Sequence, residues 1–178
     1  MQKQKIQAHI SNQIITSNNS EAYSLQQKSG FGENTNGKIQ YSLAEALYLI
    51  EKGKLEVLSS KSKSNTFLKF NELMNKFKKI DKKFHLKYIV FEDLREKGYI
   101  VKTALKFGAD FRVYDKGQKP GKSHAKWLVF VEHESSKLAM HEFSAKNRVA
   151  HSTKKSLLLA IVDEESSVSY YEVNWKRI

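Results

Sequence analysis

The spacing of apolar residues along this chain changes several times, and each change predicts a new element of secondary structure. In the first half, apolar residues three or four positions apart predict helices, and short alternating runs predict strands. Ser42 and Glu45 form a capping-box pattern that marks the start of one helix. The elements predicted here are a hairpin over 3–16 turning at Ser11-Asn12, helices over 21–27, 43–50 and 67–77, a strand over 55–58, and loops over 29–38 and 59–65.

The second half alternates between strands and helices. In residues 109–114 the apolar side chains occupy every other position, so Asp110, Arg112 and Tyr114 share the opposite face of the predicted strand. The elements predicted here are helices over 86–96 and 136–154 and strands over 99–105, 108–114, 125–132, 156–162 and 168–173. Within the second helix, the side chains expected to point inward are Leu138, His141, Phe143 and Ala145.

A charge-dense segment, Lys76 to Lys83, separates the two halves and predicts a domain boundary near Phe84. We therefore expect an N-terminal α/β domain over residues 1–83 and a C-terminal domain over residues 84–178. The order of elements in the second domain predicts a mixed sheet with one helix before it and another within it, so the fold class is α/β in the broad sense that includes α+β.

The net charge is strongly positive, because 31 Lys and Arg residues outnumber 19 Asp and Glu residues to give +12. A basic chain of this kind favours a polyanionic partner, most often a nucleic acid, although lysine that only solvates the surface is the alternative. There is no cysteine, which excludes disulfides, thiolate metal sites and a Cys nucleophile. The N-terminus lacks an apolar signal region, and the longest apolar run, 157–162, is too short to span a bilayer, so we expect a soluble, cytoplasmic protein.

Three side chains in the second half make a set suited to RNA cleavage. Tyr114 ends one predicted strand, His124 opens the next after a loop rich in Gly and Lys, and Lys155 precedes a later strand. Attack of a ribose 2′-OH on the adjacent phosphate needs a base, an acid for the leaving 5′-oxygen and a cation for the charge on phosphorus. Each residue alone also fits a packing or surface role, so only the combination carries the hypothesis.

A metal-dependent DNase is the competing interpretation. Asp110 and Glu132 on successive strands resemble the carboxylate pair of Mg²⁺-dependent nucleases. Such sites usually place a lysine two residues after the Glu, and this chain has Glu134 there. Asp110 is therefore expected to be structural, paired with Arg112 or Lys106, and His133, His141 and His151 show no metal-ligand spacing.

From about residue 40 to the C-terminus the sequence resembles the archaeal tRNA-splicing endonucleases, also called tRNA-intron endonucleases or lyases. The first 38 residues match poorly. The resemblance is carried by long motifs: Leu43-Ala-Glu-Ala-Leu-Tyr-Leu-Ile50, the stretch from Tyr88 to Val101, Lys106-Phe-Gly-Ala-Asp-Phe-Arg-Val-Tyr114, His124 and Arg148-Val-Ala-His-Ser-Thr-Lys-Lys155.

The resemblance implies a fold, a site and a reaction. The C-terminal domain is expected to have a restriction-endonuclease-like fold. The family's catalytic residues fall on Tyr114, His124 and Lys155, with Lys154 the less favoured neighbour. The expected substrate is precursor tRNA folded as a bulge–helix–bulge, cut to a 2′,3′-cyclic phosphate and a 5′-hydroxyl without a metal or other cofactor.

The resemblance also implies contacts with RNA and with other subunits. The family's pair that holds a flipped bulge base falls on Arg148 and Trp175. An acidic loop, Asp163, Glu164 and Glu165, is expected to dock into a basic pocket of a neighbouring subunit. We therefore expect a homotetramer, or a heteromer with a paralogous subunit, and all three catalytic residues are present, which argues against an inactive subunit that only binds RNA.

Overall fold

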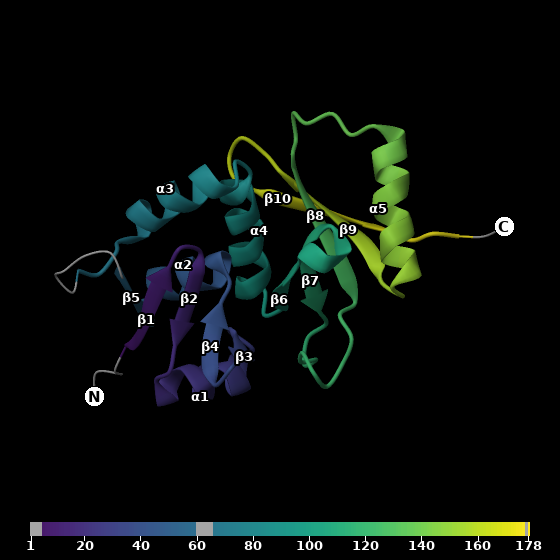
Figure 1. Ribbon diagram of the computed structural model, residues 1–178. Helices are drawn as coiled ribbons and strands as arrows, with labels where there is room; N and C mark the ends of the chain where they lie inside the picture. Colours follow the sequence, from purple (N-terminus) through teal and green to yellow (C-terminus); the bar gives the residue numbers. More distant parts are fainter. Residues whose placement is uncertain (1–4, 60–65, 177) are drawn as a thin grey trace. The chain divides into compact units, whose positions relative to one another are not determined.

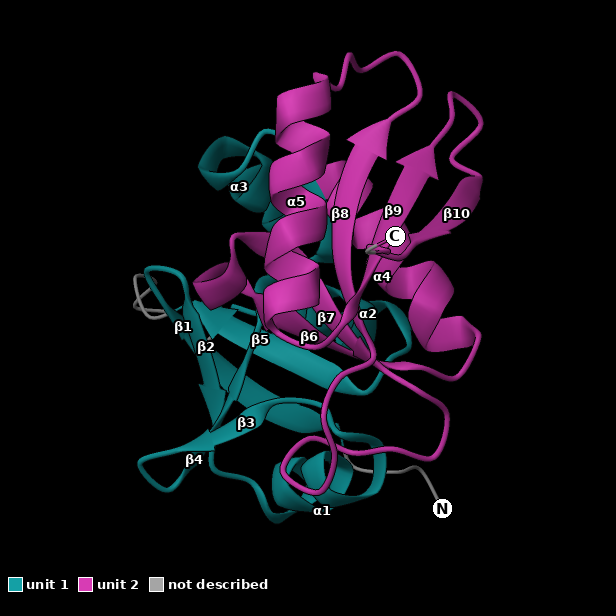
Figure 2. Cartoon of the chain, turned by 90° about the vertical axis from the view of Figure 1, so that its right-hand side faces the viewer, with its two compact units in different colours: residues 1–84 teal, residues 85–178 magenta. Residues whose placement is uncertain are grey.

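Two separate five-stranded sheets organise the residues described by this computed structural model, which are 5–59, 66–176 and 178 (Figure 1). Each sheet belongs to one of two compact units, Met1–Phe84 and His85–Ile178 (Figure 2). Both units mix helices with strands, which confirms the predicted fold class. Over these residues, no helix combines the length and the apolar character that crossing a membrane requires.

The first unit is built on a sheet with the strand order β3-β4-β2-β1-β5. β1 pairs with β5 in parallel, and the other neighbours are antiparallel. Alternate residues of β1, Ile6, Ala8 and Ile10, are buried, as expected for a sheet with one face on the core. The elements are β1 Ile6–Ser11, β2 Ile14–Ser17, α1 Ser20–Ser29, β3 Glu33–Thr35, β4 Lys38–Tyr41, α2 Leu43–Glu51, β5 Leu55–Ser59 and α3 Phe70–Ile80.

The capping box at α2 forms as the sequence predicts. The Ser42 hydroxyl accepts the Glu45 backbone N–H at 3.3 Å, and the Glu45 carboxylate accepts the Ser42 backbone N–H at 2.9 Å. The second carboxylate oxygen accepts the backbone N–H of Gly32 at 3.0 Å. Glu45 is only 3% exposed, so these bonds satisfy a charge that is costly to bury without partners.

Three predictions for this unit are wrong in detail. The first hairpin turns at Asn12-Gln13, one residue after the predicted Ser11-Asn12. The loop expected over 29–38 contains β3 and joins β4 in a hairpin whose turn is Asn36-Gly37, with φ of 50° and 73°. Asn-Gly is favoured in such two-residue turns because both positions need positive φ. The predicted helix over 67–77 begins at Phe70 instead, and Phe67 pairs with Leu58 in an isolated bridge. Residues 60–65 of the predicted loop lie outside the described residues, as do residues 3 and 4 of the hairpin.

The second unit carries the sheet with the strand order β10-β9-β8-β7-β6. β8 and β9 are parallel, and the other neighbours are antiparallel. The elements are α4 Phe84–Glu96, β6 Ile100–Ala104, the short 3-10 helix η1 Leu105–Phe107, β7 Ala109–Tyr114, β8 Trp127–His133, α5 Met140–Ser152, β9 Ser156–Val162 and β10 Val168–Val173.

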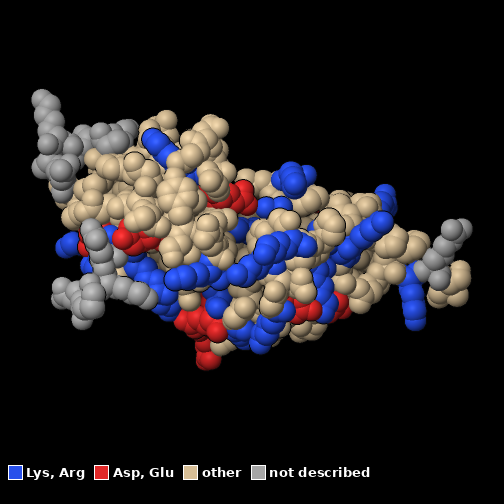
Figure 3. Space-filling view, turned by 90° about the horizontal axis from the view of Figure 1, so that it is seen from below, with Lys and Arg blue, Asp and Glu red and all other residues tan. Residues whose placement is uncertain are grey.

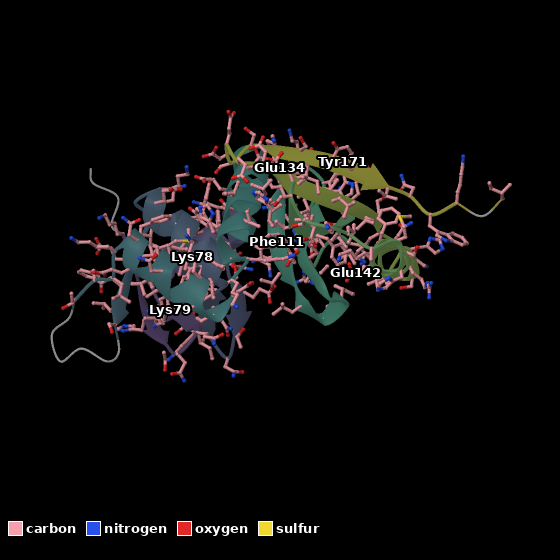
Figure 4. All side chains as sticks on the ribbon, turned by 90° about the horizontal axis from the view of Figure 1, so that it is seen from above. Lys78, Lys79, Phe111, Glu134, Glu142 and Tyr171 are labelled. Atoms are coloured by element: carbon pink, nitrogen blue, oxygen red, sulfur yellow. The ribbon has the colours of Figure 1, made fainter. Side chains whose placement is uncertain are left out.

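The two faces of this second sheet are covered by different helices. α5 lies over one face (Figure 2), where Ala150 shares a core with Leu128 of β8 and Leu157 of β9. On the other face, Phe91 of α4 contacts Phe111 of β7, with ring centroids 5.9 Å apart. Figure 4 labels Phe111 within this unit. From Phe111 to Tyr114 the predicted alternation holds, with Phe111 against α4 and Arg112 on the α5 face. At the start of β7 it is wrong: the register shifts between β6 and β7, so Ala109 lies in the core under α5 and Asp110 forms an ion pair with Lys87 of α4.

The second predicted helix of this unit is shorter than expected. α5 begins at Met140, so residues 136–139, including Leu138, precede the helix. His141 and Ala145 are exposed, whereas Phe143 and Val149 pack against the core. The side chains of α5 that face the core are therefore Phe143, Val149 and Ala150. The prediction that His141 and Ala145 point inward is wrong.

Candidate active site

Three strands of the second sheet begin or end in one row, and this row brings distant segments of the chain together. Val113 of β7 is paired with Trp127 of β8, and Trp127 is paired with Ser156 of β9. One position further out, the Lys126 N–H donates to the Val113 carbonyl at 2.9 Å, and the Ser156 N–H donates to the Lys126 carbonyl at 3.0 Å. Tyr114 and Lys155 therefore flank the start of β8 at one end of the sheet.

Tyr114 and Lys155 lie on the face of the sheet that α5 covers, which we call the α5 face. Arg112 is directly opposite Leu128, which packs under α5, and Tyr114 follows Arg112 by two residues on the same side of β7. Tyr114 is only 4% exposed, and it is paired with Ile100 of β6. The strand thus holds the phenol in a defined position, as a catalytic group requires.

His124 lies in the loop that leads into β8, and its side chain is exposed. β8 begins at Trp127, so the prediction that His124 opens the strand is wrong by a few residues. A compact turn precedes the histidine: the Ser123 hydroxyl and the Ser123 backbone N–H both donate to the Lys119 carbonyl, at 2.9 and 3.0 Å. The His124 imidazole therefore lies in a short loop near the same end of the sheet.

Lys155 is positioned by the end of α5. Its backbone N–H donates to the Ala150 carbonyl at 2.9 Å, and its ammonium donates to the Thr153 carbonyl at 2.7 Å. Burial lowers the pKa of this ammonium, and the nearby charges of Arg112 and Lys106 lower the pKa further. Lys154 is exposed with φ of 57°, so the turn between α5 and β9 separates the two lysines and selects Lys155 as the partly buried one.

The predicted base-binding residues lie near the same end of the sheet. β10 ends beside the start of β9, because Val173 is paired with Leu157, and the Ser156 hydroxyl bonds to the Asn174 side chain at 2.8 Å. Trp175 follows and is 49% exposed. Its indole contacts His151 in the last turn of α5, with ring centroids 4.6 Å apart, while Arg148 is exposed one turn earlier. Sequence reasoning missed His151, whose only signal was its helical spacing from Arg148.

The acidic loop lies at the opposite end of the sheet, between β9 and β10. The Glu164 N–H donates to the Glu134 carboxylate at 3.1 Å, and His133 lies 3.7 Å from the Glu164 carboxylate. Figure 4 labels Glu134 near this turn. The Asp163 carboxylate accepts the Ser167 backbone N–H at 2.8 Å, so Asp163 closes the turn itself. Sequence reasoning did not anticipate this structural role for Asp163 or the part played by Glu134.

The carboxylates of the competing metal-site hypothesis have other partners. Asp110 forms an ion pair with Lys87 at 2.8 Å and accepts the Val131 backbone N–H at 2.8 Å. Its expected structural role agrees with these bonds, but the expected partners, Arg112 and Lys106, were wrong. Glu132 lies 3.7 Å from the Lys146 ammonium. Among the residues that the structure describes, no three His, Asp or Glu side chains gather as a metal would require.

Two family models match this chain, one in each half. The model described as "tRNA intron endonuclease, catalytic C-terminal domain" matches residues 84–170. The model described as "tRNA intron endonuclease, N-terminal domain" matches residues 6–74. The second match reaches into the first 38 residues, for which the motifs in the sequence gave no support.

Curated relatives agree with both matches. A protein named tRNA-splicing endonuclease from Thermococcus gammatolerans is 46% identical over 153 residues, which cover 86% of this chain and 87% of the relative. Proteins of the same name from Pyrococcus horikoshii and Methanothermobacter thermautotrophicus are 41% and 36% identical over 174 residues, with at least 97% of each chain covered. The resemblance inferred from the motifs is confirmed: this chain belongs to the tRNA intron endonuclease family and is an endonuclease.

Proposed function

We propose that this endonuclease excises introns from precursor tRNA by cutting the RNA at bulge–helix–bulge motifs. The observation that supports this most is the row of strand ends that places Tyr114 and Lys155 on either side of the start of β8. His124 lies in the loop a few residues before the start of β8. A base, an acid and a cation thus come from three segments to one end of a sheet, which is the set that 2′-OH attack needs.

The proposed reaction is a transesterification that needs no water and no metal. Tyr114, as its phenolate, takes the proton of the ribose 2′-OH, and the 2′-oxygen forms a bond to phosphorus as the bond from phosphorus to the 5′-oxygen breaks. His124 gives a proton to that 5′-oxygen, which leaves as a hydroxyl. Lys155 stabilises the negative charge on the phosphate oxygens in the transition state. The products are a 2′,3′-cyclic phosphate and a 5′-hydroxyl.

Recognition of the RNA is proposed to depend on shape and charge. Lys and Arg side chains are spread over the face shown in Figure 3, and acidic side chains occupy smaller groups there. Such a surface binds phosphates without reading sequence. Arg148 and Trp175 are proposed to hold a bulge base between a guanidinium plane and an indole, because each stacks on any base.

Assembly is proposed to proceed through the acidic turn. Glu164 and Glu165 are exposed on a chain with a net charge of +12. Docking of this turn into a basic pocket of a second subunit would give a homotetramer, or a heteromer with a paralogue. Two active sites in one assembly match the two bulges of the substrate.

One experiment tests the proposed function directly. The purified chain is incubated in EDTA with a bulge–helix–bulge RNA and with the same RNA carrying a single 2′-deoxy nucleotide at the scissile position. We expect cleavage of the first RNA to a 2′,3′-cyclic phosphate and no cleavage of the second. Cleavage of both RNAs, or cleavage that appears only with added Mg²⁺, would support the metal-dependent nuclease instead. Binding without cleavage would indicate a non-catalytic subunit.

A further inference from the structure

Two ammonium groups lie over one phenyl ring beside the candidate active site. The Lys106 ammonium is 5.1 Å from the centroid of the Phe107 ring, and the Lys155 ammonium is 5.4 Å from the same centroid. Lys106 is exposed, whereas Phe107 is partly buried against the core beneath α5. The short helix η1 therefore fixes an aromatic platform and presents a second lysine next to the one already assigned to the reaction.

Further positive charge lies in the neighbouring strands. Arg112 of β7 is directly opposite Lys102 of β6, so both side chains belong to the α5 face that also carries Tyr114. Lys102 is only 3% exposed. Arg112 and Lys106 both act on Lys155 by lowering its pKa. The ammonium groups of Lys106 and Lys155 repel each other, so an anion that contacts both lowers this repulsion.

Among the residues that the structure describes, no acidic side chain neutralises the two lysines on the ring. Over residues 5–59, 66–176 and 178, neither Lys106 nor Lys155 forms an ion pair with a carboxylate. Their described contacts are the Phe107 ring and, for Lys155, the Thr153 carbonyl. A partner anion must therefore come from outside this unit or from solvent.

We propose that Lys106 is a second phosphate-binding residue of this active site, and that Phe107 is the platform beside which Lys106 and Lys155 bind one RNA phosphodiester. Lys155 approaches from the turn after α5, and Lys106 approaches from η1. Two cations from different segments can contact both non-bridging oxygens of one phosphate, which orients phosphorus for in-line attack. Because Lys106 is exposed, it acts as a positioning residue that captures the phosphate.

This inference rests on the proposed function for its substrate, and the substitution Lys106→Gln tests it. Lys137→Gln is the matched control, because it removes the same charge from an exposed lysine between β8 and α5, beyond the far end of β8. Affinity is measured on a bulge–helix–bulge RNA with a 2′-deoxy nucleotide at the scissile position, across a range of salt concentrations. Single-turnover cleavage is measured on the all-ribose RNA.

We expect Lys106→Gln to weaken binding or slow cleavage by roughly 10- to 100-fold, the typical effect of losing one charged hydrogen bond. The salt slope of binding should also fall by about 1, because one phosphate contact is lost. Lys106→Arg should recover most of the loss, and Lys137→Gln should change little. If Lys106→Gln matches Lys137→Gln in affinity, rate and salt slope while the wild type cleaves normally, the inference is wrong and the proposed function stands.

An NMR titration with inorganic phosphate separates the two claims. Phosphate is added to protein with ¹³C-labelled lysine, and the signals of Lys106 and Lys155 are followed. We expect both signals to shift with one dissociation constant, and we expect Lys106→Gln to weaken the response of Lys155. These results would support the phosphate site even if the wild type cleaved no RNA. Shifts with different constants, or an unchanged Lys155 response in the variant, would overturn it.

Discussion

The indole of Trp175 lies against the imidazole of His151, with ring centroids 4.6 Å apart and planes tilted by 35°. One side of the indole is thus supported by the last turn of α5, and 49% of Trp175 remains exposed. Replacing Trp175 with Ala should weaken RNA binding by about 1–3 kcal/mol, the usual value of one stacked base. Trp175→Phe, which keeps an aromatic ring, should lose less.

The same variants test whether Trp175 has a binding role or only a packing role. Thermal unfolding of Trp175→Ala should change little, because half of the side chain is already exposed. Arg148→Ala and His151→Ala measured beside it show which residue opposes the indole when RNA is bound, and we expect Arg148→Ala to be the weaker binder. A Trp175→Ala protein that unfolds, with a folded fraction that cleaves normally, would rule out the base clamp.

The acidic turn between β9 and β10 predicts a charge-dependent assembly. Asp163 is left unchanged because its carboxylate accepts the Ser167 N–H and holds the turn. Glu164→Lys combined with Glu165→Lys should give smaller species in sedimentation velocity, and the wild-type assembly should weaken as salt rises. The isosteric changes Glu164→Gln and Glu165→Gln should have a smaller effect. An unchanged assembly in the charge-reversed protein would exclude this docking role.

Lys155 is predicted to reduce stability at neutral pH. Its pKa is lower in the folded chain than in the unfolded chain, because burial and the charges of Arg112 and Lys106 disfavour the ammonium. The folded chain therefore binds fewer protons between the two pKa values, and stability rises with pH through that window. Lys155→Met should unfold at a higher temperature than the wild type at pH 7, and the difference should shrink by about pH 10.5, near the ordinary pKa of lysine.

The same variant should be almost inactive. Losing a group that stabilises transition-state charge typically costs about 10²–10³-fold in rate. Single-turnover cleavage and thermal unfolding are measured on the same preparation, so that a folded, inactive protein can be recognised. The pKa shift is contradicted if the stability of the variant relative to the wild type does not fall between pH 7 and about pH 10.5. A variant that cleaves at the wild-type rate would contradict the role of Lys155.

Asp110 is predicted to stabilise the fold without taking part in the reaction. Asp110→Ala removes the ion pair with Lys87 and leaves the Val131 N–H without its acceptor. The free energy of unfolding should fall by about 1–3 kcal/mol, the usual cost of an unsatisfied buried group. Cleavage in EDTA per folded molecule should stay within a few-fold of the wild type. A loss of activity in a stable Asp110→Ala protein would favour the carboxylate-based mechanism.

Local patterns were sufficient for most elements of this chain. The alternation of residues 109–114 and the apolar run at 157–162 predicted β7 and β9, and the Ser42 and Glu45 pattern predicted the start of α2. The hairpin of β3 and β4 was also predictable, because Asn36-Gly37 is a strong turn signal. It was missed because β3 has only three residues, all exposed, and gives no apolar alternation.

The arrangement of the site depends on register between distant strands, which no local pattern contains. Trp127 of β8 pairs in parallel with Ser156 of β9, although all of α5 separates the two residues in the sequence. This pairing is the reason that Lys155 lies beside the start of β8. The contact of His151 with Trp175 depends likewise on where β10 ends. The sequence predicted which residue types the reaction needs, and the register shows which of them share one end of the sheet.

The proposed acid–base mechanism requires His124 to act as the general acid. The 5′-oxygen is a poor leaving group unless it is protonated as its bond to phosphorus breaks, and an imidazolium is the best donor available near neutral pH. His124→Ala should therefore slow single-turnover cleavage by about 10²–10⁴-fold. Binding should be nearly unchanged, because phosphate contacts dominate affinity for RNA.

The most direct measurement uses an RNA with a bridging sulfur in place of the 5′-oxygen at the scissile bond. A thiolate leaves with little protonation, so the account predicts that His124→Ala cleaves this RNA at close to the wild-type rate, while Lys155→Met remains slow on it. If His124→Ala stays slow on the 5′-sulfur RNA yet binds it normally, His124 is not the acid, and the assignment of Tyr114, His124 and Lys155 to their roles is contradicted.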